Sequence, residues 1–364
     1  MKAFNDVYRG KTVLVTGHTG FKGSWLSIWL TSLGANVVGY ALDPYSDRSN
    51  YCASHLKDRL FADERGDMRD EKRLEEVIAK YKPEIIFHLA AQALVRTSYQ
   101  NPKYTYETNL MGSLNLLEMV RKFDFIKTVV MITSDKCYEN VEQIWGYKET
   151  DRMGGYDPYS SSKGCTELMI ASYRNSYFNP ADYAKHGKAV ASVRAGNVIG
   201  GGDWSDNRLI PDCIRFIEEG KDIEIRSPHA TRPWEHVLEP LSGYLRVGQK
   251  LMEDPVRYSQ GFNFGPSIEC NKTVWEVVDY LVKYYGKGKV IDVSGAEKVH
   301  ENTLLSLDVT KAYHLLQWKA MLKLHEAIEF TVDWYKEALT TEDMFEFCKK
   351  QIQAHMDKGY LWEL

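Results

Sequence analysis

The sequence has no long apolar run and no concentration of positive charge. No segment approaches the ~18 consecutive apolar residues that a membrane-spanning helix needs. The opening residues, MKAFNDVYRG, lack the apolar stretch of a signal peptide. The net charge is −4 over 364 residues, and no Lys/Arg cluster offers a footprint for phosphates. We therefore expect a cytoplasmic protein with neither a membrane nor a nucleic-acid partner.

Cysteine is also scarce. The chain has six cysteines, which are scattered and form no C-x-x-C pair. This pattern is typical of reduced, structural thiols in a cytoplasm, and it offers neither a disulfide framework nor a zinc site. We predict no bound metal. The cysteines are Cys52, Cys137, Cys165, Cys213, Cys270 and Cys348.

The chain does contain an alternation of short apolar runs and amphipathic stretches. The apolar runs predict strands over residues 11–16, 36–42, 83–91, 127–133 and 189–200. Between them, apolar residues at helical spacing predict helices over residues 21–34, 69–81, 104–123 and 160–178. Parallel strands need crossover connections, so this alternation predicts an α/β fold with a doubly wound parallel sheet.

The alternation weakens after about residue 196, where GGGDWSDN and SPHATRPWEH interrupt it. We assign residues 1–195 to a first domain, to which some later segments return. Residues 196–364 are assigned mostly to a smaller, mixed α/β C-terminal domain that binds substrate. From Thr340 onward the pattern predicts a terminal amphipathic helix packed on the body or on a partner.

Three glycines, Gly17, Gly20 and Gly23, separate the first predicted strand from its helix. Glycines there let the backbone turn tightly and approach a pyrophosphate, which the helix N-terminus then binds. Asp43 follows at the distance expected of a carboxylate that binds the adenosine ribose. Its charge would repel a 2′-phosphate, although Arg48 lies nearby in sequence. The loop therefore predicts a Rossmann NAD site in preference to an NADP site; the alternative is a purely structural turn.

Predicted cofactor contacts extend beyond the glycine loop. Asp67, in GDMRD, is assigned to the adenine amino group. The full set of predicted NAD contacts is Gly17, His18, Thr19, Gly20, Phe21, Lys22, Gly23, Asp43, Asp67, Met68, Leu89, Ala90, Ala91, Tyr159 and Lys163.

The run YSSSK places Tyr159 and Lys163 four residues apart, on one face of a predicted helix. A lysine ammonium beside a phenol stabilises the phenolate, and an oxidised nicotinamide would add to the effect. The tyrosine pKa can then fall from ~10 toward neutrality, which suits a general base. The alternative is a surface helix pair, which is less consistent with an upstream glycine loop.

A second polar group, TSDK, ends the predicted strand 127–133. It is either a surface turn of solvated charges or a catalytic triplet. The carboxyl ends of parallel strands face the ligand crevice of a doubly wound sheet. We therefore predict that Ser134, Asp135 and Lys136 are catalytic.

The motifs TGHTGFKG, HLAAQ, YETN, TSDKCY, YSSSK, VRAGNVIGGGDW and RPWEHV occur in an order that resembles the extended short-chain dehydrogenases/reductases. More narrowly, nearly the whole chain resembles the nucleotide-sugar 4,6-dehydratases, and GHTGFKGSWL, TSDKCYEN and RPWEHVLEP most resemble members acting on CDP-glucose. The resemblance implies a nucleotide-diphosphate hexose substrate, with CDP-glucose favoured, and a tightly held, internally recycled NAD. It further implies a 4-keto-6-deoxy product that leads to the 3,6-dideoxyhexoses of bacterial O-antigens.

The resemblance also implies a role for each catalytic residue. Tyr159 takes the 4-hydroxyl proton, and Ser134 hydrogen-bonds the 4-oxygen. Asp135 protonates the leaving 6-hydroxyl, and Lys136, by position, removes the C5 proton. The residues implied in substrate binding are Asn109, Asn197, Arg208 and Arg232.

The chain departs from the family pattern at two places. His18 and Lys22 stand where relatives have small or apolar residues, and they are expected to change the charge beside the pyrophosphate. Lys136 stands where dehydratases acting on TDP- or GDP-sugars have glutamate, so the usual C5 base is missing from its expected position.

Two other functions use the same fold. A nucleotide-sugar C4 epimerase or reductase needs Tyr159 and Lys163 but no acid/base pair at the strand end. An NAD-sensing regulator that binds without turnover tends to lose the tyrosine or the lysine. We also expect a homodimer, or a dimer of dimers, through the helices that begin near Tyr104 and Tyr159, because these helices carry more apolar residues than one sheet-facing stripe requires.

Overall fold

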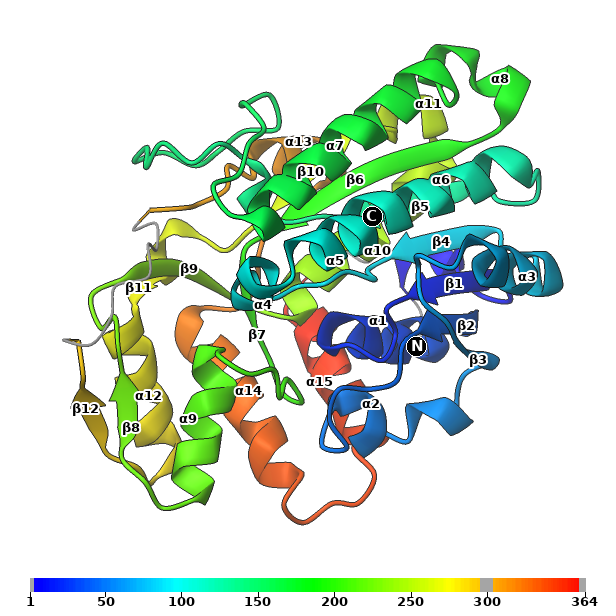
Figure 1. Cartoon of the computed structure of the whole chain (residues 1–364). Coiled ribbons are helices and arrows are strands. Elements are labelled where there is room, and N and C mark those ends of the chain that lie inside the picture. Colours follow the sequence, from blue (N-terminus) through cyan, green and yellow to red (C-terminus); the bar gives the residue numbers. More distant parts are fainter. Residues whose placement is uncertain (1–2, 295–303, 360–364) are drawn as a thin grey trace.

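The computed structural model describes residues 3–294 and 304–359, and a seven-stranded parallel sheet forms its centre. Figure 1 shows the strands side by side in the order β10-β6-β5-β4-β1-β2-β3. The order reverses between β1 and β4, which confirms the predicted doubly wound α/β sheet. The strands are β1 (Thr12–Thr16), β2 (Asn36–Ala41), β3 (Ala62–Arg65), β4 (Ile85–His88), β5 (Thr128–Ile132), β6 (Ala189–Ala195) and β10 (Gly261–Phe264).

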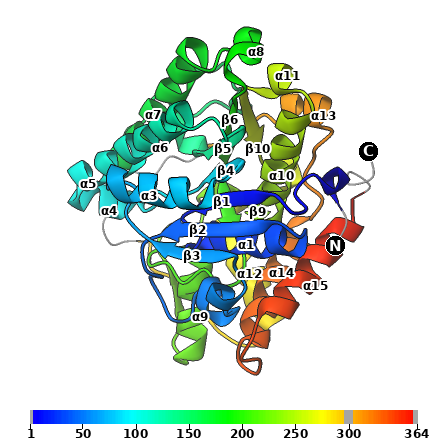
Figure 2. The ribbon, with the colours of Figure 1, turned by 90° about the vertical axis from the view of Figure 1, so that its right-hand side faces the viewer.

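Helices cover both faces of the sheet, as Figure 2 shows in a side view. Helices α1 and α10 pack on one face, in a core that continues into the C-terminal half of the chain. Helices α3, α6 and α7 pack on the other face over a second, smaller core. These helices are α1 (Phe21–Ser32), α3 (Glu71–Tyr81), α6 (Gly112–Lys122), α7 (Pro158–Ser176) and α10 (Leu238–Glu253).

Much of the C-terminal half forms a smaller unit beside the carboxyl ends of the strands (Figure 1). It contains a three-stranded and a two-stranded sheet, ordered β11-β9-β7 and β12-β8. Its elements are β7 (Asn197–Ile199), β8 (Ile223–Ile225), β9 (Thr231–His236), β11 (Asn271–Thr273), β12 (Val290–Asp292), α9 (Leu209–Glu218), α12 (Val274–Tyr285) and α14 (Leu324–Glu337). The assignment of residues 196–364 mostly to a substrate domain stays a prediction.

Later segments do return to the large sheet. Strand β10 pairs with β6, and helix α10 packs on β5 and β6. Helix α15 (Phe345–Asp357) packs on α1, where the rings of Trp29 and His355 meet edge to face. The predicted terminal helix thus lies on the body of the protein. The remaining helices are α2 (Asn50–Ala53), α4 (Val95–Gln100), α5 (Pro102–Tyr106), α8 (Tyr183–His186), α11 (Pro255–Tyr258) and α13 (Thr310–Leu316).

Three elements differ from the sequence prediction. The strand predicted over residues 189–200 is divided into β6 in the large sheet and β7 in the three-stranded sheet. The edge strand β3 was not predicted because ADER has no apolar run, and all four of its residues are only half-buried. The helix predicted over residues 104–123 is divided into α5, a π-helical turn at Glu107–Met111, and α6. Such turns often occur at functional sites, and this one carries Asn109.

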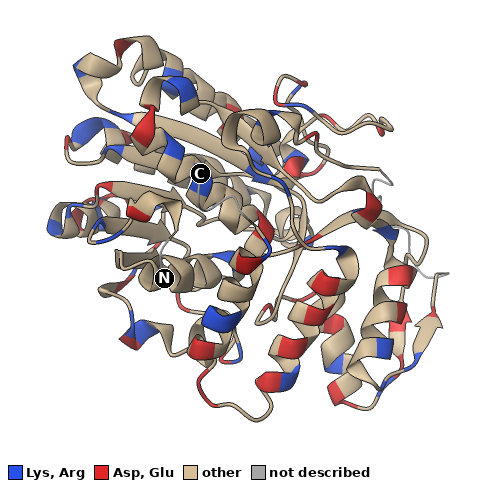
Figure 3. Cartoon of the chain, turned by 180° about the vertical axis from the view of Figure 1, so that it is seen from behind, with Lys and Arg blue, Asp and Glu red and all other residues tan. Residues whose placement is uncertain are grey.

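Charged residues of both signs are interspersed along the helices (Figure 3). Within the described ranges, no helix is both long enough and apolar enough to cross a membrane.

Candidate active site

The glycine loop leaves no room for side chains. Gly17 has a φ of +76°, and a Cβ on it would lie 2.8 Å from the backbone nitrogen of Ala90. A Cβ on Gly23 would lie 2.1 Å from the carbonyl oxygen of Gly17. Helix α1 begins at Phe21 without a side-chain cap, so its first N–H groups are available to an anion. The loop therefore fits a pyrophosphate.

The His18 side chain is directed at the edge strand β3. Its ring is fully buried against Gly39, and Nε2 lies 2.5 Å from Asp63 Oδ1 on β3. Burial lowers the pKa of His18, although the Asp63 carboxylate opposes the shift. The predicted change of charge beside the pyrophosphate is therefore not supported for His18, because its ring links the loop to the edge strand.

Lys22, in contrast, interacts electrostatically with charged residues from other parts of the site. Burial lowers the pKa of Lys22 to about 8, against the opposing effect of the Glu235 carboxyl. Arg208 and Asp135 also act electrostatically on Lys22. Lys22 and the acids Asp135 and Glu235 therefore influence one another's charge.

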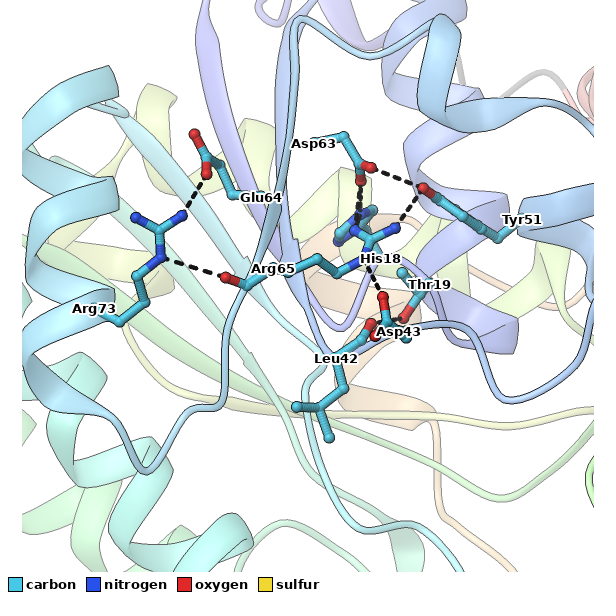
Figure 4. Close-up of polar contacts among 9 residues, drawn as sticks. All are labelled: His18, Thr19, Leu42, Asp43, Tyr51, Asp63, Glu64, Arg65 and Arg73. Carbon is cyan, nitrogen blue, oxygen red and sulfur yellow. Dashed lines mark hydrogen bonds and ion pairs between the residues drawn. The ribbon is translucent and has the colours of Figure 1, made fainter.

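The predicted ribose carboxylate lies just beyond the end of β2. The side chain of Asp43 is 88% exposed and accepts a hydrogen bond from Arg65 Nε at 3.0 Å (Figure 4). Arg48 is engaged elsewhere: its guanidinium binds Glu218 and stacks on Trp204. The arginine beside Asp43 is therefore Arg65 of β3, which the sequence analysis did not identify.

The other predicted cofactor residues lie in the segments that follow β1, β3 and β4. The Asp67 carboxylate accepts hydrogen bonds from Arg69 Nε at 3.1 Å and from Arg69 Nη2 at 2.8 Å. An adenine amino group would therefore compete with Arg69 for this carboxylate. Met68 is buried against Gly112. Thr19 Oγ1 donates to the carbonyl of Leu42 at 2.9 Å and joins the loop to the end of β2. Leu89, Ala90 and Ala91 follow β4 and are half-buried.

Tyr159 and Lys163 lie in the first two turns of α7, and both are buried. The helix begins after Asp157, whose side chain accepts a hydrogen bond from the backbone of Ser160 at 2.9 Å. Burial raises the pKa of Tyr159 to about 12, and hydrogen bonding with Ser134 opposes this. The predicted lowering of the Tyr159 pKa is therefore not seen in the protein alone, because desolvation is the largest effect on the phenol. Burial lowers the pKa of Lys163 itself to about 8.

The TSDK segment is not a surface turn. Ser134 begins a short 3-10 turn directly after β5, and its Oγ donates to Asp135 Oδ1 at 2.9 Å. Ser134 and Asp135 are only 7% and 4% exposed, and Lys136 is half-buried. Burial raises the pKa of Asp135, while the Lys136 ammonium opposes the shift. A raised pKa suits a proton donor.

Two of the four predicted substrate residues are asparagines, and they differ in how many hydrogen bonds they already make within the protein. The Asn109 amide is already bonded to the backbone of Gln92, at 2.8 and 3.0 Å, and to Ser162 Oγ at 2.9 Å. Asn109 therefore ties the loop after β4 to α7 and has little capacity left for substrate. Asn197 begins β7 and is half-buried.

Two arginines lie on the C-terminal side of the site. Arg208 precedes α9, binds Asp203 Oδ2 at 2.8 Å and acts electrostatically on Tyr159. Arg232 lies on β9 and donates to the Thr231 carbonyl at 2.9 Å.

Glu235 is a further acid in this region that sequence reasoning missed. It lies on β9, is 2% exposed, and its carboxyl lies within reach of the backbone of Gly196. Burial raises its pKa well above the usual value, and the Lys22 ammonium opposes this. The available signal was an acidic residue between Trp234 and Val237 in RPWEHV. Among the described residues, no group of His, Cys, Asp or Glu could hold a metal ion.

Known proteins are similar to this chain. The family described as GDP-mannose 4,6 dehydratase matches residues 14–331. The chain belongs to this family. The resemblance to nucleotide-sugar 4,6-dehydratases that the motifs indicated is thereby confirmed. A CDP-glucose 4,6-dehydratase from Salmonella typhimurium is 51% identical over 96% of this chain and 98% of its own length.

More distant relatives include proteins named for another activity. A UDP-glucose 4-epimerase from Rhizobium leguminosarum bv. trifolii is 27% identical over 90% of this chain and 98% of the epimerase. The structure of a dTDP-glucose 4,6-dehydratase from Streptomyces venezuelae, with NAD and TYD bound, aligns with a TM-score of 0.75. That protein is 23% identical, and the alignment covers 90% of this chain and 97% of the other. The likeness confirms the fold.

Proposed function

We propose that the protein is an NAD-dependent 4,6-dehydratase that converts CDP-glucose to CDP-4-keto-6-deoxyglucose and water. The observation that carries the proposal is the buried Ser134–Asp135 pair at the end of β5, joined through Ser134 to Tyr159. The family supports the reaction class, and the 51% identical relative supports CDP-glucose as the substrate. We place the reaction in the cytoplasm, on the route to O-antigen dideoxyhexoses; all six cysteines are free thiols.

The glycine loop and the α1 N-terminus bind the NAD pyrophosphate, and Asp43 accepts hydrogen bonds from the adenosine ribose. Bound NAD supplies the acceptor for the hydride from sugar C4 and later donates it to C6. Arg208 and Arg232 bind the substrate diphosphate from the C-terminal side, with Asn197 on a phosphate oxygen.

Tyr159 begins the reaction by taking the proton of the 4-hydroxyl. Because burial holds the phenol pKa at about 12, the positive charges of Lys163 and of the oxidised nicotinamide are needed to bring it down. The new 4-ketone acidifies the C5 hydrogen, which Lys136 removes in its neutral amine form, becoming an ammonium. Asp135, protonated because it is buried, gives its proton to the leaving 6-hydroxyl. Lys136 then returns a proton to C5.

The contact between Ser134 and Asp135 provides a route for the proton that each turnover must return to Asp135. Each turnover leaves the 4-hydroxyl proton on Tyr159 and leaves Asp135 without one. One proton must therefore pass from Tyr159 to Asp135 before the next turnover. Ser134 lies between them, with its Oγ donating to Asp135 and facing the phenol. Its hydroxyl can relay that proton without exchange with solvent.

A C4 epimerase is the second candidate, since one relative at 27% identity has that activity. Oxidation and reduction at C4 alone do not require a buried acid such as Asp135, because no hydroxyl group leaves the sugar. Incubation with CDP-, TDP-, GDP- and UDP-hexoses separates the two functions. A 4-keto chromophore in alkali, formed fastest from CDP-glucose, is the expected result. A C4 epimer without a keto product would favour the epimerase.

Lys136 is assigned to C5, and its replacement tests that assignment. A Lys136→Met variant keeps the side-chain length but has no basic nitrogen. We expect it to lose both product formation and exchange of the C5 hydrogen with deuterated solvent, measured by NMR on the recovered nucleotide sugar. Lys148→Met, at an exposed position, is the control. Exchange at the native rate would place the base elsewhere, for instance at a carboxyl such as Glu235, and would leave Lys136 to stabilise the enolate.

The oligomer is expected to form through α5, α6 and α7. Met111 and Leu168, near or on these helices, are 46% and 60% exposed. Pairing two copies would bury these side chains in a four-helix bundle. Light scattering at micromolar concentration should give a dimer or a dimer of dimers, and Met111→Glu with Leu168→Glu should give monomers.

Leu339→Glu, equally exposed but distant in sequence from these helices, is the control and should keep the oligomer. A native protein that is monomeric and fully active would contradict this interface.

A further inference from the structure

Arg65 and Asp43 occupy the same corner of the predicted ribose site. Arg65 Nε donates to Asp43 Oδ1 at 3.0 Å, and Figure 4 shows the guanidinium between Asp43 and a buried cluster behind it. Thr19 fixes the carbonyl of Leu42, the residue before Asp43. The carboxylate and the guanidinium are therefore presented together at the end of β2.

The other nitrogens of Arg65 are held from behind. Nη1 donates to Asp63 Oδ1 at 2.8 Å, and Nη2 donates to the Tyr51 hydroxyl at 2.7 Å. Asp63 is itself bound by His18 and Tyr51, and its side chain is 8% exposed. Burial opposes ionisation of Asp63, but the hydrogen bonds from His18 and Arg65 hold its pKa well below the usual value. Arg65 is thus anchored independently of Asp43.

The anchored position of Arg65 affects whether the site binds NAD or NADP. In dinucleotide-binding folds, a carboxylate at the ribose binds the 2′-hydroxyl of NAD, whereas a nearby arginine accommodates the 2′-phosphate of NADP. Both groups are present here. If Asp43 is removed, the anchored guanidinium stays in place with its Nε–H directed at the vacated position.

We propose that Arg65 is a cofactor-specificity residue: a latent 2′-phosphate ligand that the Asp43 carboxylate masks in the native protein. The inference rests on the proposed use of NAD. It predicts that the preference for NAD depends on Asp43 alone and that loss of this one side chain exposes an NADP site already built. A charge-assisted hydrogen bond gained or lost corresponds to about tenfold or more in affinity.

Calorimetric titration of the folded protein tests the role of Arg65 without requiring turnover. The ligands are NAD, NADP, 5′-ADP and 2′,5′-ADP. The Asp43→Ala variant should bind NAD about tenfold more weakly and NADP about tenfold more tightly than the native protein. It should also prefer 2′,5′-ADP to 5′-ADP. The Asp43→Ala, Arg65→Ala double variant should lose the increase in affinity for NADP and 2′,5′-ADP, the two ligands that carry a 2′-phosphate.

Arg73→Ala in the Asp43→Ala background is the matched control. Arg73 binds Glu64 and the Arg65 carbonyl, not Asp43, so the gain for 2′,5′-ADP should remain. No gain for NADP in a folded Asp43→Ala variant, or an equal gain in the double variant, would overturn the inference. Failure of the native protein to bind NAD would instead overturn the proposed cofactor. The pair of ADP ligands still reports on Arg65 in that case.

Discussion

An Asp135→Asn variant will still reduce NAD when substrate is added, but it will release almost no dehydrated product. The amide keeps the shape of the carboxyl and can still accept a hydrogen bond from Ser134, so the site should fold unchanged. It has no acidic proton to give the leaving 6-hydroxyl. Product formation should fall by about 10²–10⁴-fold, the usual contribution of a general acid. NADH absorbance and a 4-keto-hexose should accumulate on the enzyme.

Rapid mixing with spectrophotometry, followed by chromatography of the quenched sugar, measures both quantities in one sample. Asp279→Asn, on the exposed face of α12 beside Lys283, is the control and should behave as the native enzyme does. Product released at the native rate would show that another group protonates the 6-hydroxyl.

A Tyr159→Phe variant should stop the reaction earlier. Phenylalanine keeps the ring but cannot take the 4-hydroxyl proton, so C4 is not oxidised. Without the 4-ketone the C5 hydrogen is not acidic, and elimination stops as well. We expect neither NADH absorbance nor product, each reduced by at least about 10²–10⁴-fold. NAD affinity in a direct titration should fall by no more than about tenfold, the loss of one hydrogen bond, which separates lost chemistry from lost cofactor.

Asp135→Asn and Tyr159→Phe together separate the two halves of the reaction. NADH formation by Tyr159→Phe at a rate near that of the native enzyme would remove Tyr159 from the role of base. If Asp135→Asn instead abolished NADH formation, Asp135 would be needed before elimination.

The central sheet and the catalytic segments were predictable because their signals are local in sequence. The glycine loop, TSDK and YSSSK each follow a strong apolar run or precede an amphipathic helix, so strand ends and helix starts place them at one edge of the sheet. The structure buries Ser134, Asp135, Tyr159 and Lys163 there. Burial explains the missed direction of the Tyr159 pKa shift, since desolvation is not visible in the spacing of Tyr159 and Lys163.

Other parts of the site depend on contacts between residues far apart in sequence. Arg65 meets Asp43 from an edge strand, β3, that has no apolar pattern of its own. The His18 ring contacts Asp63, which lies 45 positions later in the chain, and this contact joins the glycine loop to β3. Glu235 reaches the site from β9, in the half of the chain where the alternation of strands and helices had weakened. Only the folded arrangement brings these groups together.

The central claim is that one enzyme-bound cofactor moves a hydride from C4 to C6 of the same sugar. The most direct test uses CDP-glucose carrying deuterium at C4, mixed with an equal amount of unlabelled substrate that carries a distinguishable heavy-carbon ring. Mass spectrometry and NMR of the 4-keto-6-deoxy product should find the deuterium at C6 and only on the molecules that began with it. Deuterium that stays at C4 of an epimer, is lost to solvent, or appears on the heavy-carbon product would contradict the account.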